Sequence, residues 1–422
     1  MPPLQAAIRA MWKCDGNFLE LLPKCAFTED VVPFGRGGSL LVNHPIIAKH
    51  ILSDEGDSFY KSDLLVKSVE RLGGRSIFIT TGDQWASDKD KLNPAYHSIR
   101  PSLSFGTIQS VIANYRLPEH DFNLDFEMYC LTSSVIWKLM YGEDLNREIA
   151  RQLFNDWTLF KKHVSSADIA AYIMNPSRVG PQPKEFEYAC DRIRMQMNDA
   201  LHTKLKPDTV AYHIIQAGFK GSELTDQLTV FYLAGHETTA SVLTWVFYIL
   251  TQQPEWKEIL QEEIDEVITD GLTLDKLKLL INTKAFFQEA LRLYPPSTVF
   301  PRCPKKDVTI EGHTLKKDRS ILVIPYALHR NKKYWVNPDA FLPERFLPQN
   351  RGAIIPGTYI PFGNGPHICA GKHFAQMEAL MVMAYLIHRY DFELPYKQKV
   401  EVVHQLTTAP KEQIRMIAKC RF

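Results

Sequence analysis

One cysteine, Cys369, lies in a glycine-rich loop just before the last apolar helix predicted for the chain. The segment reads PFGNGPHICAGKHFAQMEA over residues 361–379. The glycines Gly363, Gly365 and Gly371 let the backbone approach a flat ligand and adopt positive φ angles. Backbone N–H groups at the start of the following helix point at the sulfur, and the helix dipole favours the thiolate. An iron-bound thiolate requires both effects, because N–H donors tune how much electron density the sulfur gives to iron.

A second chemical feature is the polar block GHETT inside the apolar segment 223–253. An acid and a hydroxyl, Glu237 and Thr238, are costly in such a helix unless they are paired or hydrated. A threonine can also bond the carbonyl one turn back and loosen the helix. The residues alone leave two interpretations open, namely a helix–helix hydrogen bond or an acid–alcohol pair that handles protons.

These features resemble the cytochrome P450 superfamily, with E-class-like motifs. The haem-binding signature of that family, Phe–Gly–x–Gly–x–Arg/His–x–Cys–x–Gly, is matched at Phe362, Gly363, Gly365, His367, Cys369 and Gly371. The resemblance implies that Cys369 binds the iron of haem b (iron protoporphyrin IX). It also implies that His367, in place of the more usual arginine, lies against a haem propionate.

Other segments match the family in the same order along residues 80 to 380. Trp85 and Lys89 correspond to the family's Trp-x-x-x-Arg, which reaches a propionate, with lysine in place of arginine; Arg302 corresponds to the strand arginine that contacts the other propionate. Glu289 and Arg292 lie three residues apart, so they share a helix face and can pair. The resemblance joins Arg345 to this pair as a structural triad, although a solvated surface pair is the ordinary interpretation of such spacing.

The resemblance also assigns roles to the central polar block. Thr238 is the residue expected to relay protons during dioxygen activation, supported by Glu237, while Gly235 and Ala234 open space for oxygen and water. The substrate pocket is expected to include Phe231, Ala234, Thr298, Val299 and Leu406.

Composition restricts the class of protein. The chain has 422 residues, 45% of them hydrophobic and 23% charged, and a formal charge of +1, which argues against nucleic-acid binding through bulk positive charge. Its seven cysteines, Cys14 among them, show no CxxC pair, so reduced thiols in a cytosol are expected. No signal peptide or membrane-spanning run is found, which predicts a soluble, cytoplasmic protein.

The elements that must carry these residues are mostly helical. The pattern of apolar residues and breakers predicts helices over 124–140, 150–165, 184–204, 223–253, 274–294 and 373–390, a loop over 173–185, and short strands within 29–52, 308–315 and 320–326. The family resemblance implies a further helix over 82–98. The expected fold is mainly α with a minor β part. It is a single cytochrome P450 domain over residues 1–422, with haem between the long central helix and the Cys-loop helix.

The implied reaction is insertion of one oxygen atom from dioxygen into an apolar or amphipathic small molecule, such as a fatty acid or terpenoid. Electrons must come from a separate ferredoxin or flavodoxin/reductase type of donor, because the chain contains no GxGxxG motif and no cysteine cluster. Lys305, Lys306 and Lys372 are candidate contacts for it, and a monomer is expected. Two other functions stay open: a haem-thiolate peroxygenase, isomerase or dehydratase, and a non-enzymatic haem carrier or sensor.

Overall fold

The computed structural model describes residues 17–34, 39–53, 58–174, 183–202 and 204–422. Cys14 and the central part of the predicted loop 173–185 lie outside these residues. The described helices are α2 Pro45–Ser53, α3 Asp63–Gly73, α4 Gly82–Ser98, α5 Pro101–Asn114, α6 Leu124–Tyr141, α7 Arg147–Met174, α8 Lys184–Asp199, α9 Val210–Gln216, α10 Gly221–Leu250, α11 Pro254–Ile268, α12 Ile281–Leu293, α13 Pro325–Leu328 and α14 Lys372–Arg389.

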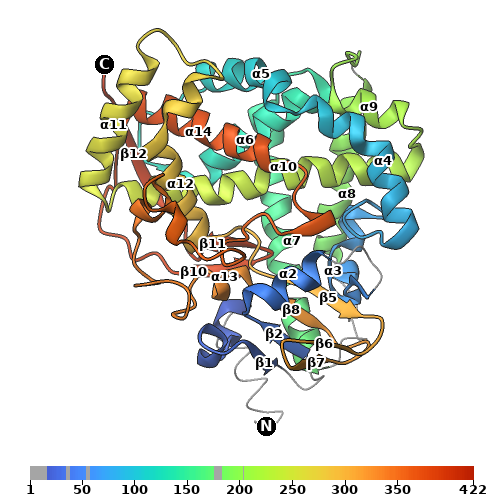
Figure 1. The fold of residues 1–422 in the computed structure, drawn as a ribbon. Helices are drawn as coiled ribbons and strands as arrows, with labels where there is room; N and C mark the ends of the chain where they lie inside the picture. Colours follow the sequence, from blue (N-terminus) through green and yellow to red (C-terminus); the bar gives the residue numbers. More distant parts are fainter. Residues whose placement is uncertain (1–16, 35–38, 54–57, 175–182, 203) are drawn as a thin grey trace.

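The strands form a smaller part of the molecule. They are β1 Val31–Phe34, β2 Ser39–Val42, β3 Phe59–Lys61, β4 Phe122–Asn123, β5 Phe300–Pro304, β6 Val308–Ile310, β7 His313–Leu315, β8 Ile321–Val323, β9 Tyr390–Glu393, β10 Val402–Gln405, β11 Thr407–Pro410 and β12 Arg415–Cys420. The strands β1, β2 and β5–β8 lie at the lower end in Figure 1, whereas β12 lies beside α11 and α14. The largest sheet has the order β1-β2-β8-β5-β3, so it joins residues near 40 and 60 to residues near 300 and 320. The predicted mainly-α fold with a minor β part is confirmed.

The helix α10 crosses the middle of the molecule (Figure 1). Its apolar residues occur on all sides, which is the pattern of a helix packed on every face, and most of its residues are buried. Pro254 occupies the first turn of the next helix, α11, where its missing N–H costs nothing. The helix predicted over 223–253 is therefore confirmed.

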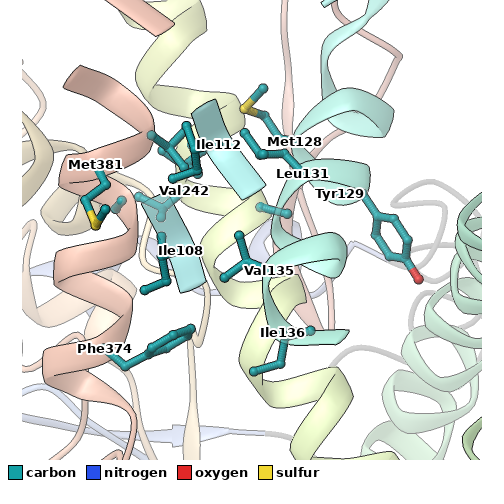
Figure 2. Close-up of a cluster of buried hydrophobic side chains, with 14 of the residues drawn as sticks. Ile108, Ile112, Met128, Tyr129, Leu131, Val135, Ile136, Val242, Phe374 and Met381 are labelled. Atoms are coloured by element: carbon teal, nitrogen blue, oxygen red, sulfur yellow. The ribbon is translucent and has the colours of Figure 1, made fainter. Parts of the chain in front are cut away.

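Four helices make the core that fixes α10 against the Cys-loop helix. Ile108 and Ile112 of α5 lie between α14 and α6, and Val242 of α10 and Met381 of α14 are buried in the same cluster, as Figure 2 shows. Residues at i and i+4 lie on one face of a helix, which is why α5 can present both isoleucines to this core. The position of α14, and of the loop that opens it, follows from this packing.

The helix predicted over 274–294 is wrong in its first turn. Residues Lys276–Leu279 form a separate 3₁₀ turn, and α12 begins only at Ile281. Glu263 of α11 accepts the N–H groups of Asn282 and Thr283 at 2.7 and 2.8 Å. The start of α12 is thus capped by a neighbouring helix rather than by a local residue, so no local signal marks it.

The predicted triad is brought together on α12. Glu289 and Arg292 are fully buried and form a bidentate ion pair with both distances at 2.7 Å, and Arg345 Nε lies 3.3 Å from the same carboxylate. The other N–H groups of Arg292 donate to the carbonyls of His329, Pro338 and Ala340. All five donors of the guanidinium fork are used, which is what makes a buried charge tolerable.

None of the described helices combines the length and the apolar run that crossing a bilayer requires.

Candidate active site

The loop before α14 is held in shape by its own backbone. The N–H of Cys369 donates to the carbonyl of Phe362 at 3.0 Å. Gly363 and Gly365 have φ angles of 74° and 70°, a region that side chains disfavour. A Cβ at Gly365 would also lie 2.3 Å from the carbonyl oxygen of Leu52. The glycine spacing of the signature therefore has a steric cause, which is the close approach of this loop to α2.

The Cys369 side chain has accessible surface, although protein atoms surround it closely. Burial raises the pKa of its thiol, whereas the backbone N–H of Gly371 and the charge of Lys372 act to lower it. Both opposing groups come from the start of α14, as the sequence predicts. The sulfur is therefore stabilised as a thiolate only in part by the protein, and a bound cation would complete its neutralisation.

Trp85 and Lys89 of α4 reach the same loop. The ring of Trp85 lies 3.9 Å from the ring of His367 between centroids. Lys89 Nζ lies 4.8 Å from the Trp85 ring and 3.4 Å from the carbonyl oxygen of Pro366. Trp85, Lys89 and His367, each of which the family resemblance assigns to a haem propionate, are thus adjacent in space.

Two further cations lie on paired strands beside His367. Lys61 of β3 and Arg302 of β5 stand directly opposite each other in the antiparallel register, where like charges destabilise a sheet. Desolvation, and then the charge of Arg302, lowers the pKa of Lys61 to about 7, and burial lowers the pKa of Arg302 to about 10. Desolvation together with the charges of Lys61, Arg302 and Lys89 lowers the pKa of His367 to about 3.

This cationic cluster of Lys61, Lys89 and Arg302 has no carboxylate at ion-pair distance among the described residues. Lys89 is exposed, whereas Lys61 is buried and its Nζ donates to the carbonyls of Ile77 and Thr80 at 2.8 and 2.9 Å. A group of neighbouring cations that includes buried ones favours a bound anion. The donor set, one cysteine sulfur beside clustered cations and a polar tryptophan ring edge, fits an iron porphyrin that carries two propionate groups. The residues present therefore fit haem.

The polar block of α10 is arranged as two separate groups. Thr238 donates from Oγ1 to the carbonyl of Ala234 at 3.1 Å, and Ala234 is exposed although most residues of the helix are buried. Glu237 is buried, and its Oε1 accepts from Lys161 of α7 and from Thr407 of β11, both at 2.7 Å. The i→i−4 bond of Thr238 is the kind that loosens a helix locally.

Gly235 lies where α10 passes close to α6. A Cβ there would lie 2.7 Å from Cδ1 of Ile136 on α6, and Figure 2 shows Ile136 on the side of α6 that faces α10. The missing side chain allows the two helices to approach each other. Gly235 therefore has a packing role in this structure, and its role in leaving space for oxygen and water stays a prediction.

The predicted pocket residues differ in their surroundings. Phe231 stacks on Tyr96 of α4 with centroids 5.8 Å apart. Thr298 is fully buried and its hydroxyl lies 2.7 Å from Nδ1 of His404. Val299 packs against the cluster of Phe18 and Leu41 near the N-terminal strands. Leu406 forms the turn between β10 and β11 with a φ of 69°. Ala234 and Leu406 keep accessible surface, whereas Thr298 has none.

Sequence reasoning missed Lys61, Lys161 and Thr407. Lys161 carries a signal that could have been found, because it lies on the apolar face of its helix with Trp157 and Val164, where a charge requires a partner. Lys61 and Thr407 end or begin short strands, and neither spacing nor composition distinguishes such residues from ordinary ones.

Comparisons with known proteins agree with this geometry. A family model described as Cytochrome P450 matches residues 32–416. A protein of Glycine max named Cytochrome P450 97B2, chloroplastic, is 28% identical over 90% of this chain and 78% of its own length. Cytokinin hydroxylase of Arabidopsis thaliana is 25% identical over 91% of this chain and 80% of its own length. Protein LUTEIN DEFICIENT 5, chloroplastic, of the same plant is 27% identical over 86% of this chain and 66% of its own length.

Proposed function

Because the chain belongs to the cytochrome P450 family, we propose that it inserts one oxygen atom of dioxygen into an apolar or amphipathic small molecule, with Glu237 and Thr238 handling the protons. The family and its hydroxylase relatives make the chain an oxidoreductase of the monooxygenase type, with haem iron as the cofactor. The observation that carries the proposal is the pair of a buried Glu237 and a Thr238 beside the exposed Ala234, in a helix packed against the Cys-loop helix.

The residues that would hold haem lie on four elements. Cys369 would supply the sulfur ligand, supported by Phe362, Gly363 and Gly371 of its loop. Trp85, Lys89, Arg302 and His367 would hold the propionates, and Lys61 joins them because it shares their cluster. When bound, haem supplies the activation of dioxygen and the transfer of oxygen to substrate.

The chain's own contribution to the chemistry is proton supply. Thr238 presents a hydroxyl oxygen that already donates to the carbonyl of Ala234, so this oxygen can accept a proton from an acid and pass one on. Glu237, the adjacent acid, is held by Lys161 and Thr407 within a buried site. An acid fixed in a site that excludes water can move protons without releasing reactive intermediates to solvent.

The proposed substrate contacts are those with accessible surface, Ala234 and Leu406, with Phe231 and Val299 around them. Thr298 would act through its hydrogen bond to His404 rather than by direct contact. One relative is named for cytokinin hydroxylation and another for lutein deficiency, which supports a small, largely apolar substrate such as a terpenoid or fatty acid.

The electrons would come from a separate donor of the ferredoxin or flavodoxin/reductase type. Three basic residues are proposed to contact this donor. Lys372 lies three residues after Cys369, and the exposed Lys305 and Lys306 lie further from Cys369 along the chain. A monomer in the cytoplasm remains part of the proposal. The free described cysteines support a reducing compartment.

The test compares two routes of turnover in the parent protein and in Thr238→Ala. With an electron donor and dioxygen, Thr238→Ala should consume the donor but release peroxide instead of product, because the hydroxyl that passes protons is gone. The absorption spectrum of the reduced protein with carbon monoxide should show the red-shifted band of thiolate ligation in both proteins.

Equal rates with peroxide alone, unchanged in Thr238→Ala, would instead support a peroxygenase or isomerase. Haem binding without donor consumption for any substrate would support a carrier or sensor. Absence of the thiolate band in the parent protein would remove Cys369 as the ligand.

A further inference from the structure

One oxygen of the Glu237 carboxylate is held from two sides. Lys161 Nζ and Thr407 Oγ1 both donate to Oε1, each at 2.7 Å. All three residues are buried, with exposed fractions of 5%, 4% and 6% for Lys161, Glu237 and Thr407. No described residue donates to the second oxygen, Oε2. The carboxylate is therefore fixed in orientation, and its two oxygens are chemically different.

The two donors come from segments that are far apart in the chain. Lys161 lies on α7, and Thr407 is the first residue of β11, directly after the turn residue Leu406. The helix α7 also packs against β10 of the same hairpin. Three elements, α7, α10 and the β10–β11 hairpin, thus meet at a single oxygen atom.

The charges around this oxygen favour a lasting ion pair. Burial acts to lower the pKa of Lys161, but the charges of Glu237 and Asp125 outweigh it, so the pKa lies above its ordinary value. The other titratable groups near the pair are Asp125 and Tyr129 on α6 and Tyr232 and His236 on α10. Burial lowers the pKa of His236 to about 4, so this imidazole is neutral at pH 7. Lys161 therefore remains the only cation described at the acid.

We infer that Lys161 and Thr407 are positioning residues that clamp Oε1 of Glu237, so that Oε2 is the atom that takes up a proton from water and passes it towards Thr238, which restores the carboxylate. The clamp rests on the function proposed above for Glu237. Because Thr407 adjoins Leu406, the same turn that borders the proposed substrate pocket also orients the acid. Neither residue touches the reacting atoms, and both act through Glu237.

The hydroxyl half of the clamp is tested with Thr407→Val and Thr407→Ser. Valine keeps the volume and removes the donor, so the ratio of peroxide released to product formed should rise about tenfold, as expected for one lost hydrogen bond to a charged group. Serine keeps the donor and should restore the parent ratio. Thr309→Val, at an exposed threonine of β6, controls for the substitution itself. A parent-like ratio in Thr407→Val would overturn the role of Thr407.

The cationic half is tested with Lys161→Met, alone and combined with Glu237→Gln, with Lys162→Met at the exposed neighbouring position as the control. If Lys161 acts only through Glu237, the double variant should couple no worse than Glu237→Gln alone. Additive losses in the double variant would show a general structural role and would contradict the clamp.

The outcomes separate the clamp from the proposed function. The thiolate band of the reduced carbon monoxide complex shows that each variant is folded and carries its cofactor. If Glu237→Gln couples like the parent, the proposed role of Glu237 fails. If Glu237→Gln is uncoupled while Thr407→Val and Lys161→Met are parent-like, only the clamp fails.

Discussion

At the scale of single residues, the site depends on positions where no side chain fits. Gly365 has a φ of 70°, and a Cβ built at this position would lie 2.3 Å from a backbone atom of α2. The atom in the way is the carbonyl oxygen of Leu52, which cannot rotate aside as a flexible side chain could. The loop must move if Gly365 changes, and Cys369 moves with it.

Gly365→Ala should therefore lose most of the haem that the parent protein retains after purification. The measurement is the haem absorbance per polypeptide, together with the carbon monoxide spectrum of the reduced protein. Gly352→Ala is the matched control, because a Cβ at Gly352 meets nothing within 4 Å. Equal haem content in the parent and in Gly365→Ala would show that the loop tolerates the shift.

Residues whose chemistry depends on local spacing could be predicted from the sequence. Cys369, Gly363 and Gly365 are examples, since the loop that they form is closed by bonds within a few residues. Lys61 could not be predicted, because its importance comes from Arg302, which pairs with it across the sheet from more than 200 positions away. The packing role of Gly235 depends in the same way on Ile136 of another helix.

At the scale of elements, the fully satisfied guanidinium of Arg292 joins α12 to the segment around residues 329–345. Its five donors serve Glu289 and three backbone carbonyls, and the guanidinium also lies 5.0 Å from the Trp335 ring. A lysine offers three donors and no planar fork. Any replacement leaves buried carbonyls without partners.

Arg292→Lys should lower the free energy of unfolding by about 3 kcal/mol or more, because at least two of the five buried acceptor contacts would lose their donor. Urea unfolding followed by circular dichroism measures it. Lys278→Met, which removes the exposed pair with Asp275, should leave the stability close to that of the parent protein. Similar losses in the two variants would mean that burial does not set the strength of these pairs.

The helices themselves show where element prediction succeeds. The segment 223–253 was predicted to within three residues, because its apolar run is long and Pro254 marks the start of the next helix. The segment 82–98 was predicted from the family resemblance of Trp85 and its neighbours. The start of α12 was missed because Glu263, a residue of α11, supplies its cap. A sequence pattern predicts contacts between residues that are close in the chain, but not contacts between residues that are far apart in it.

At the scale of the whole molecule, burial of neutral histidines links stability to pH. His404 is 8% exposed, and burial lowers its pKa to about 4. The unfolded chain binds a proton at His404 as the pH falls below about 6.5, whereas the folded chain does not until about pH 4. Its contribution to stability is therefore complete above pH 6.5 and is lost as the pH falls towards 4.

The test compares the parent protein with His404→Asn. Burial raises the pKa values of the acids Glu378 and Asp125, so these acids change stability with pH in the opposite direction. Because both proteins contain them, their effect cancels in the difference between parent and variant. The stability difference between parent and variant should shrink by about 1.4 kcal/mol for each pH unit below 6.5. Denaturant midpoints at pH 7.5, 6.5 and 5.5 measure this difference. A difference that stays constant with pH would show that the His404 ring is protonated in the folded state as readily as in the unfolded chain.

The opposed cations of β3 and β5 bear on how stable the newly made chain is in the cell before it binds its cofactor. Lys61 and Arg302 face each other across a sheet edge without an anion at ion-pair distance among the described residues, so the fold carries a repulsion that a bound dicarboxylate would relieve. Binding of the cofactor is then also a step in maturation. We expect that a newly made chain lacking haem is the form most exposed to chaperones and proteases, and that haem supply, rather than synthesis alone, determines how much of the protein accumulates.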